Sequence, residues 1–278
     1  MSDEQFGRVV IDVRDGVADV RLNRPDKRNA LDGAMFLAIA AAGERLIHEP
    51  GVRAVVLSGE GASFCAGLDF GGFLAMAAGE PTAAPTEESG HPGSMVPGRI
   101  THLAQQICWV WQEVPVPVIA ALHGHALGGG LQLALGADVR IAHPGTKLSV
   151  REGHWGLIPD MTGTFVLSQL VRPDIAKELT FTARIFEAVE GERLGVVTRL
   201  ADDPHAAATA LAAEIAGNSP DAVRAAKTLF ARRFHAGAAE HLRAERDAIA
   251  ALIGAPNQVE AVTAEFERRP PAFTDPSA

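Results

Sequence analysis

Apolar and polar residues alternate along the first part of the chain. Two alternating runs within residues 8–23, VVIDVRD and VADVRLN, predict two short strands, and Asp15–Gly16 between them predicts a hairpin turn. Leu31 to His48 has apolar residues at three- and four-residue spacings, which predicts a helix that Pro50–Gly51 ends. The apolar run from Arg53 to Leu57 predicts a further strand. The chain therefore opens as strand, strand, helix, strand.

A glycine-rich stretch, PVIAALHGHALGGGLQLALGADVRIAH, occupies Pro117 to His143. Val118 to Leu122 suits a buried strand; three consecutive glycines begin at Gly128, and a helix-forming run then leads to a second apolar strand. A glycine turn at a helix N-terminus leaves backbone N–H groups free to bind a phosphate or an oxyanion. The glycines do not fall as GxGxxG, and no Lys-Ser or Lys-Thr pair follows them, which disfavours a nucleotide loop. The remaining alternative is that the glycines only let the helix pack closely on the strand.

Helical spacing dominates the chain from Pro204 onward, where Ser219 and Pro220 form an N-cap and first-turn pair. Helices are expected over residues 99–113, 204–217, 220–234, 238–254 and 256–268, and a strand over Val196–Leu200. The pattern predicts an α/β core over residues 1–200 and a C-terminal helical region over residues 201–278. Residues 71–98 are rich in Gly, Pro, Ala, Thr and Glu, which predicts a long surface insertion after a short helix near Phe73–Ala78.

Composition narrows the class of protein. The chain has 278 residues of which 47% are hydrophobic, enough for a sizeable core. No run of about 18 apolar residues is present, and the first residues lack a hydrophobic signal region, so we expect a soluble cytoplasmic protein with no membrane partner. The net charge of −9 argues against nucleic-acid binding.

The cysteine and histidine positions indicate neither a disulfide framework nor a metal site. The cysteines are Cys65 and Cys108, and Cys65, with no base beside it in the sequence, is interpreted as a small buried residue. His123, His125 and His154 have no metal-ligand spacing, and HExxH is absent. No metal is therefore expected.

Several separated motifs resemble those of one family. SFCAGLDF at 63–70 and the glycine-rich stretch are joined by NRPDKRNALD at 23–32, REGHWGLIPDMTGT at 151–164 and FERRPPAF at 266–273. Together these resemble the crotonase superfamily, the enoyl-CoA hydratase/isomerase family, over nearly the whole chain. The resemblance implies an α/β fold with a coiled ββα core and a C-terminal helical region used in trimer formation, so a homotrimer or a dimer of trimers is expected.

The resemblance also implies where the substrate binds. In the family, two backbone N–H groups polarise a thioester carbonyl, and the matching donors here are Leu68 and Gly129. Lys27, Arg28 and Ala30 match the family's early coenzyme A-binding loop, and Ala66 matches the segment that meets adenine. No separate cofactor is implied, because coenzyme A is part of the acyl-CoA substrate.

The acid–base positions depart from the hydratase pattern. Hydratases of the family carry two glutamates, and the matching positions here are Gln132 and Glu152. Glutamine cannot exchange a proton as a carboxylate does. Asp160 lies eight residues after Glu152, where dienoyl-CoA isomerases of the superfamily carry a carboxylate, although those isomerases are also acidic at the position of Gln132. Alternatively, Asp160 caps a helix that starts near Thr162.

The leading hypothesis is a proton-shuttling enoyl- or dienoyl-CoA isomerase. Glu152 would be the principal acid/base, Asp160 the second carboxylate and Gln132 an orienting polar group. One alternative is a trans-2-enoyl-CoA hydratase that works with one essential glutamate and a water held by Gln132. A further alternative is a catalytically weakened protein that binds a coenzyme A ester without turning it over.

Overall fold

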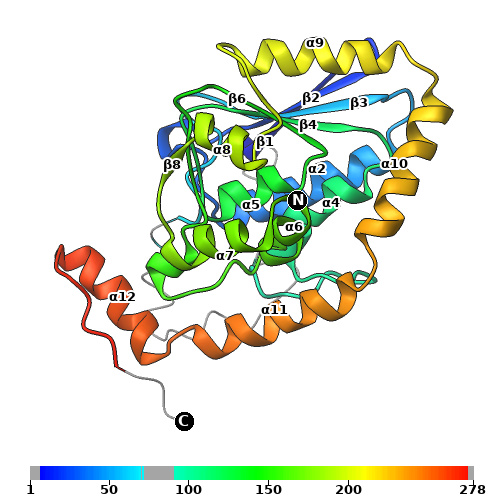
Figure 1. The fold of residues 1–278 in the computed structure, drawn as a ribbon. Coiled ribbons are helices and arrows are strands. Elements are labelled where there is room, and N and C mark those ends of the chain that lie inside the picture. Colours follow the sequence, from blue (N-terminus) through cyan, green and yellow to red (C-terminus); the bar gives the residue numbers. More distant parts are fainter. Residues whose placement is uncertain (1–6, 70, 72–90, 275–278) are drawn as a thin grey trace.

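Two sheets organise the part of the chain that this computed structural model describes, which is residues 7–69, 71 and 91–274 (Figure 1). The larger sheet has the strand order β1-β2-β3-β4-β6-β9, and the smaller one β5-β7-β8. The strands are β1 Val9–Arg14, β2 Val17–Leu22, β3 Ala54–Gly59, β4 Val118–Leu122, β5 His125–Leu127, β6 Val139–Ala142, β7 Lys147–Ser149, β8 Phe186–Glu187 and β9 Arg199–Leu200.

The predicted opening of the chain is confirmed. β1 and β2 pair as an antiparallel hairpin whose turn residues, Asp15 and Gly16, both have positive φ, as a tight hairpin requires. A short 3-10 helix, η1 (Pro25–Lys27), and the helix α2 (Gly33–His48) then lead to β3, which lies parallel to β2. The Asp32 side chain accepts a hydrogen bond from the N–H of Met35 and so caps α2.

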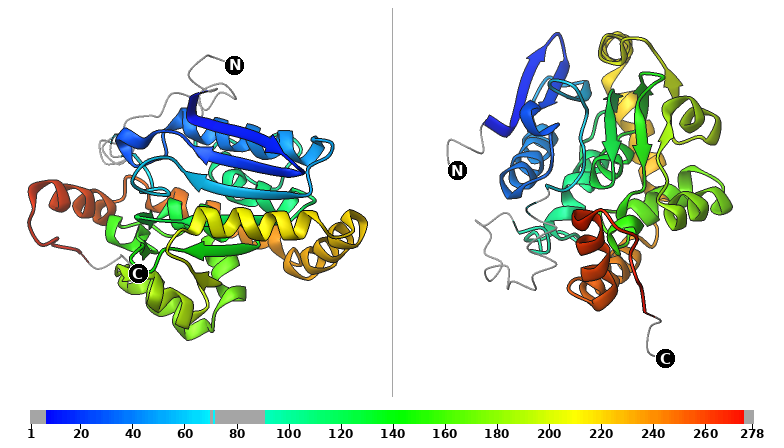
Figure 2. Two further views of the ribbon diagram at one scale, coloured as in Figure 1. Left: turned by 90° about the horizontal axis from the view of Figure 1, so that it is seen from above. Right: turned by 90° about the vertical axis from the view of Figure 1, so that its left-hand side faces the viewer.

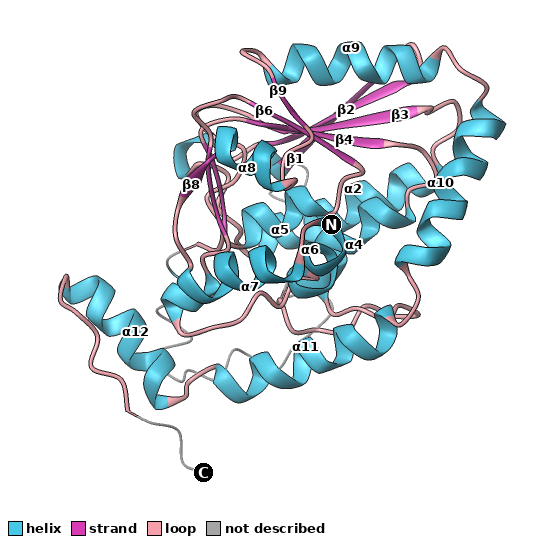
Figure 3. Ribbon diagram, in the orientation of Figure 1, coloured by secondary structure: helices cyan, strands magenta, loops and turns pink. Residues whose placement is uncertain are grey.

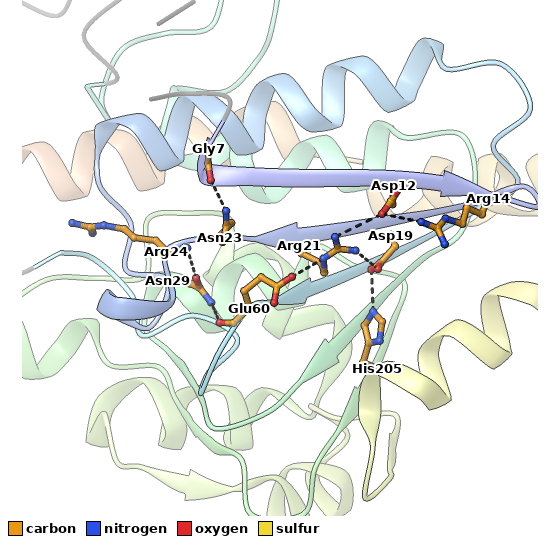
Figure 4. A network of polar contacts seen from close by, with 10 residues as sticks. All are labelled: Gly7, Asp12, Arg14, Asp19, Arg21, Asn23, Arg24, Asn29, Glu60 and His205. Carbon is orange, nitrogen blue, oxygen red and sulfur yellow. Dashed lines mark hydrogen bonds and ion pairs between the residues drawn. The ribbon is translucent and has the colours of Figure 1, made fainter. Parts of the chain in front are cut away.

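Helices cover both faces of the larger sheet. Alternate residues of β3 point to opposite faces: Val55 and Leu57 join the main core with α2 and α4 (Leu103–Glu113), whereas Ala54 and Val56 pack with α9 (Pro204–Ala216). Figure 2 shows α9, in yellow, lying across the sheet. His205 at the start of α9 also binds Asp19 of β2, with 3.0 Å between His205 Nε2 and Asp19 Oδ1 (Figure 4).

The remaining helices are α5 Gly129–Leu135, η2 Glu152–Trp155, α6 Gly163–Leu170, α7 Pro173–Thr182, α8 Ala188–Leu194, α10 Pro220–Phe234, α11 Ala238–Leu252 and α12 Pro256–Glu267. Of these, α5 and α8 contact the smaller sheet, whereas α11 and α12 run below the other helices in Figure 3. The C-terminal helices agree with the sequence pattern, and the Ser219 side chain caps α10 as predicted. α11 packs on α6 and α12 on η2, so the helical region returns to the segments after the glycine-rich stretch. The division of the chain at residue 200 stays a prediction.

Some predicted boundaries are wrong. The helix expected over 99–113 begins at Leu103, because the His102 side chain accepts the N–H of Gln105 and the Gln105 side chain accepts the N–H of His102, a capping box. The strand expected over Val196–Leu200 is reduced to Arg199–Leu200, which pairs with β6. The helix expected near Phe73–Ala78 lies outside the described residues.

Candidate active site

Two glycine-containing segments lie side by side. The N–H of Cys65 donates to the carbonyl of His125 at 2.9 Å, and the N–H of Leu127 donates to the carbonyl of Cys65 at 3.2 Å. Gly67 has a φ of +95°, and a Cβ at this position would lie 2.6 Å from the carbonyl oxygen of Leu127 and 3.8 Å from the nitrogen of Gly129. Only glycine allows so close an approach of the two backbones.

This approach brings together the two predicted donors, Leu68 and Gly129. Within the described residues, no hydrogen bond is made by the N–H group of either one. Gly129 is the first residue of α5, and Gly128 before it has φ 52° and ψ −123°, a conformation that favours glycine. Two N–H groups without an internal acceptor are suited to hold the oxygen of a polarised carbonyl.

The loop with the predicted coenzyme A contacts holds the Leu68 segment in place. Asn29 is fully buried, its side-chain N–H₂ donates to the carbonyls of Ser63 at 2.8 Å and Phe64 at 3.1 Å, and its oxygen accepts the N–H of Arg24 at 2.7 Å (Figure 4). Leu31 adds a bridge, donating its N–H to the carbonyl of Gly67 at 2.8 Å. The position of Leu68 therefore depends on a loop more than thirty residues earlier in the chain.

The predicted coenzyme A residues lie on this loop and beside it. Lys27 and Arg28 are exposed, and Ala30 is buried. The N–H of Ala66 donates to the carbonyl of Arg28 at 3.0 Å, so Ala66 adjoins the loop. The structure thus brings these four residues close to the segment of Leu68.

Glu152 is a buried carboxyl at the start of η2, directly after β7. Only 8% of the residue is exposed, and Oε1 accepts a hydrogen bond of 2.6 Å from Nε2 of Gln132. Oε2 is buried without a hydrogen-bond partner in the described part of the chain. Burial raises the pKa of Glu152 to about 7, although the bond from Gln132 favours the ionised form. Near neutral pH the carboxyl can therefore either take up or give a proton.

Gln132 on α5 is buried with its amide in one defined orientation. Its Oε1 accepts the N–H groups of Met161 and Gly163, both at 2.9 Å. Because two backbone donors fix the amide oxygen, the N–H₂ group must face Glu152. Gln132 is therefore a donor to Glu152 and an anchor for the backbone at 161–163.

Asp160 lies next to this anchored backbone and is partly buried. Burial first, then the neighbouring charges of Glu152 and Glu245, raise its pKa to about 8. The alternative that Asp160 caps α6 is wrong: Thr162 occupies the N-cap position, and its N–H donates to Oε2 of Glu245 at 3.0 Å. The charge of Glu152 thus disfavours the ionised form of Asp160.

Two buried residues of the site, Asn29 and Glu245, were not found by sequence reasoning. Asn29 belongs to the segment NRPDKRNALD. Its role is to hydrogen-bond the carbonyls of residues 63 and 64, and the sequence does not predict these contacts. Glu245 belongs to an amphipathic helix, where a glutamate resembles a solvated surface charge. Only the packing of α11 on α6 shows that Glu245 is buried.

The cysteine and histidines are engaged in structural contacts. Cys65 is fully buried, which raises the pKa of its thiol to about 12 and leaves it a poor nucleophile. His123 Nε2 contacts the carbonyl of Gly61 at 2.9 Å, and His125 Nδ1 contacts Oγ of Ser63 at 2.9 Å. Among the described residues, no group of His, Cys, Asp and Glu side chains could hold a metal ion.

A model of the enoyl-CoA hydratase/isomerase family matches residues 12–276. The chain belongs to the enoyl-CoA hydratase/isomerase family. The probable enoyl-CoA hydratase EchA14 of Mycobacterium tuberculosis is 36% identical over 223 residues, which are 80% of this chain and 81% of the relative. The probable enoyl-CoA hydratase echA8 of Mycobacterium leprae is 31% identical over 97% of this chain and 99% of the relative.

Solved structures of this family share the fold. An enoyl-CoA hydratase/isomerase from Pseudoalteromonas atlantica superposes with a TM-score of 0.78 at 27% identity, covering 96% of this chain and all of that one. Another from Mycobacterium paratuberculosis has a TM-score of 0.81 at 23% identity, covering 92% and 98%. The predicted α/β crotonase-like fold with C-terminal helices is confirmed. The protein is an acyl-CoA enzyme of the enoyl-CoA hydratase/isomerase family.

No helix in the described ranges is both long and apolar enough to cross a membrane.

Raising the pH from about 5 to about 8 is expected to lower the free energy of unfolding. Glu152 and Asp160 have native pKa values of about 7 and about 8, above the unfolded values of 4.5 and 3.8. The native state therefore binds more protons than the unfolded state in this window, so the stabilisation present at low pH is lost as the pH rises. Because Asp160 is partly exposed, we expect a loss on the order of 2 kcal/mol.

Urea unfolding at several pH values measures this loss. Between pH 5 and pH 8 the double variant Glu152→Gln/Asp160→Asn should lose less stability than the wild type. His205, whose pKa is raised, adds a slope of the same sign, and His102, whose pKa burial lowers to about 4, adds one of the opposite sign, but both slopes persist in the double variant. Equal slopes for the two proteins would contradict the assigned pKa shifts.

Proposed function

We propose that this protein isomerises an enoyl- or dienoyl-CoA by moving a proton between Glu152 and Asp160. The thioester oxygen would accept hydrogen bonds from the N–H groups of Leu68 and Gly129, which stabilises the enolate. One carboxyl would remove a proton from carbon, and the other would return a proton at the far end of the conjugated system. The double bonds shift and no atom is gained or lost overall.

The observation that carries this proposal is the identity of the two ionisable groups. Gln132 cannot serve as the second acid, because its oxygen is bound to Met161 and Gly163 and its N–H₂ to Glu152. The carboxyl whose pKa the charge of Glu152 helps to raise is instead Asp160. Their pKa values of about 7 and about 8 allow one to be ionised while the other is protonated near neutral pH.

The substrate contacts belong to the same proposal. Lys27 and Arg28 are exposed cations on a loop that adjoins Ala66 and Ala30, which suits the phosphates and adenine of coenzyme A. The acyl-CoA would bring all the chemistry required, without a separate cofactor or a metal. We also propose assembly through the helical region as a homotrimer or a dimer of trimers. Leu229 and Phe230 on α10, 66% and 80% exposed, offer apolar surface for that contact.

The second candidate is hydration of a trans-2-enoyl-CoA, which is favoured by the names of the relatives. Glu152 would then act as the one essential glutamate, together with a water held by Gln132. A third candidate, a protein that binds acyl-CoA without turnover, agrees with the neutral residue at position 132 but leaves the raised pKa values of both carboxyls unused.

Asp160→Asn separates the first two candidates. We expect it to lower the rate of 3,5-dienoyl-CoA isomerisation by about 10²-fold or more, because the second proton-transfer group is lost. Any hydration of a trans-2-enoyl-CoA should change by less than about threefold, since hydration is assigned to Glu152. Spectrophotometric assays of both reactions on wild type and variant measure the two effects.

The outcomes of this pair of assays are distinct. Hydration by the wild type without isomerisation would overturn the proposal in favour of the hydratase. Binding of both thioesters without turnover would favour the acyl-CoA-binding protein.

A further inference from the structure

Glu245 is a buried carboxyl on α11 that the proposed proton transfer does not use directly. It is only 4% exposed, and its oxygens meet three donors from two other segments. Oε2 accepts the N–H of Thr162 at 3.0 Å and Nε2 of Gln105 at 3.2 Å, and Oε1 accepts the hydroxyl of Thr164 at 2.5 Å. Burial raises the pKa of Glu245 above its usual value, whereas the three donors favour its ionised form.

These bonds place Glu245 at one end of a series of hydrogen-bonded groups that has Glu152 at its other end. The N–H groups of Met161 and Gly163 go to Gln132, and the N–H between them, that of Thr162, goes to Glu245. Gln132 then donates to Glu152. The start of α6 is therefore capped by two side chains from α5 and α11 rather than by its own N-cap residue, which makes no side-chain bond.

We propose that Glu245 is a positioning residue, which fixes the backbone that carries Asp160 and, when it is ionised, places a negative charge near that residue. This inference rests on the proposed function for its effect on turnover, but not for its effect on the backbone. α11 would thereby make the helical region part of the acid–base machinery. The charge favours the protonated form of Asp160 and so keeps it able to donate a proton above neutral pH.

The surroundings of Glu245 leave this charge only partly compensated. His241 on the same helix has its Nε2 3.8 Å from Oε1, and the same nitrogen lies 2.7 Å from the Thr164 hydroxyl. From α4, Gln105 is neutral and its oxygen accepts from Arg246, while Cys108 is a thiol whose pKa burial raises. His102 at the start of α4 stays neutral, because burial lowers its pKa to about 4. The remaining neighbours, Asp160 and Glu152, are the two acids of the site.

Two substitutions at Glu245 separate its charge from its hydrogen bonds. In Glu245→Gln the amide oxygen can still accept from Thr162 and Gln105 while its N–H₂ faces the Thr164 hydroxyl, which can turn to accept. Glu245→Ala removes both the acceptor and the charge. Glu240→Gln is the matched control, because Glu240 is exposed on the same helix.

The first measurement is amide hydrogen exchange, which needs no substrate. Glu245→Ala should lower the protection of residues 161–163 by about tenfold or more, and Glu245→Gln should restore most of it. Glu240→Gln should match the wild type. Unchanged protection in Glu245→Ala would overturn the positioning role, whether or not the protein proves to be an isomerase.

The second measurement is the pH dependence of kcat and kcat/KM from about pH 5 to about pH 9. We expect Glu245→Gln to keep KM within about twofold. The basic limb of the pH profile for isomerisation should shift down by about one pH unit, because the negative charge of Glu245 near Asp160 is removed. A profile that superposes on the wild type would overturn the role of the charge. Equal losses in both variants with unshifted limbs would also overturn it and leave a packing role.

A separate result would show that the proposed function is wrong. If the wild type hydrates a trans-2-enoyl-CoA but does not isomerise a 3,5-dienoyl-CoA, the proposed isomerase function is refuted. The hydration rate then tests the effect of Glu245 on Glu152, because Glu245 and Gln132 bind the same backbone segment and Gln132 donates to Glu152. Glu245→Ala should lower kcat for hydration, and Glu245→Gln should restore it. If hydration is insensitive to both variants, the effect of Glu245 on turnover is refuted as well, and hydrogen exchange alone decides its effect on the backbone.

Discussion

Replacing Glu152 by glutamine is expected to lower kcat between about 10² and about 10⁴-fold on whichever acyl-CoA the wild type turns over. The substitution keeps the volume and one acceptor oxygen, so the bond from Nε2 of Gln132, 2.6 Å in the wild type, can persist. It removes the carboxyl that burial holds near a pKa of 7. Because the neutral amide cannot exchange protons, the loss should fall on kcat, with KM changed less than about threefold.

The measurement is steady-state kinetics on a trans-2-enoyl-CoA and a 3,5-dienoyl-CoA, together with thermal unfolding. Glu214→Gln, an exposed glutamate on α9, is the matched control and should behave as the wild type. Above about pH 7, Glu152→Gln should be at least as stable as the wild type, because a buried charge is removed. Full turnover by this variant would refute the assignment of Glu152 in both the isomerase and the hydratase hypotheses.

The sequence predicts the elements whose signals are local. Asp15 and Gly16 between two alternating runs are sufficient for the β1–β2 hairpin, and Ser219 and Pro220 for the start of α10. The consecutive glycines predict a sharp turn before a helix, and α5 begins at Gly129. Each of these three features depends on backbone conformations that the residues at that position favour.

Long-range contacts decide what the sequence does not predict. Asn29 acts through carbonyls more than thirty residues away, and Glu245 through the N–H of Thr162. The alternative of a helix cap at Asp160 is wrong for the same reason, since a glutamate from α11 receives the bond that a local side chain would have received. Periodicity in α11 indicates which face is apolar, but not that one carboxylate on it is buried against α6.

In the candidate site, too, local motifs are predicted from the sequence and long-range contacts are not. Motif positions identify Gln132, Glu152 and Asp160, yet only the structure gives the orientation of the Gln132 amide and the effect of Glu152 on the pKa of Asp160. Both depend on the backbone at 161–163, which receives side chains from two helices. The catalytic and donor roles remain predictions that the kinetic variants test, and the coenzyme A-binding roles remain predictions.

Replacing Gly67 by alanine is expected to lower kcat/KM by about 10²- to 10³-fold, the effect of losing one oxyanion donor. The new Cβ would lie 2.6 Å from the carbonyl oxygen of Leu127, which is backbone and cannot turn aside. Either that carbonyl or Gly67 must move. Because Leu68 follows Gly67 and Gly129 follows Leu127 by two residues, the movement separates the two N–H groups that would hold the thioester oxygen.

A matched control removes the contribution of backbone strain. Gly51 also has a positive φ, +81°, but a Cβ there would meet no atom within 4 Å. Gly51→Ala and Gly67→Ala should therefore both lose stability, by about 1 kcal/mol or more, whereas only Gly67→Ala should lose activity per folded molecule. Kinetics below the melting temperature of both variants, with the folded fraction measured by circular dichroism, make the comparison. If Gly67→Ala keeps its activity within about threefold, the separation of Leu68 from Gly129 has no catalytic consequence, and the oxygen of the thioester is held elsewhere.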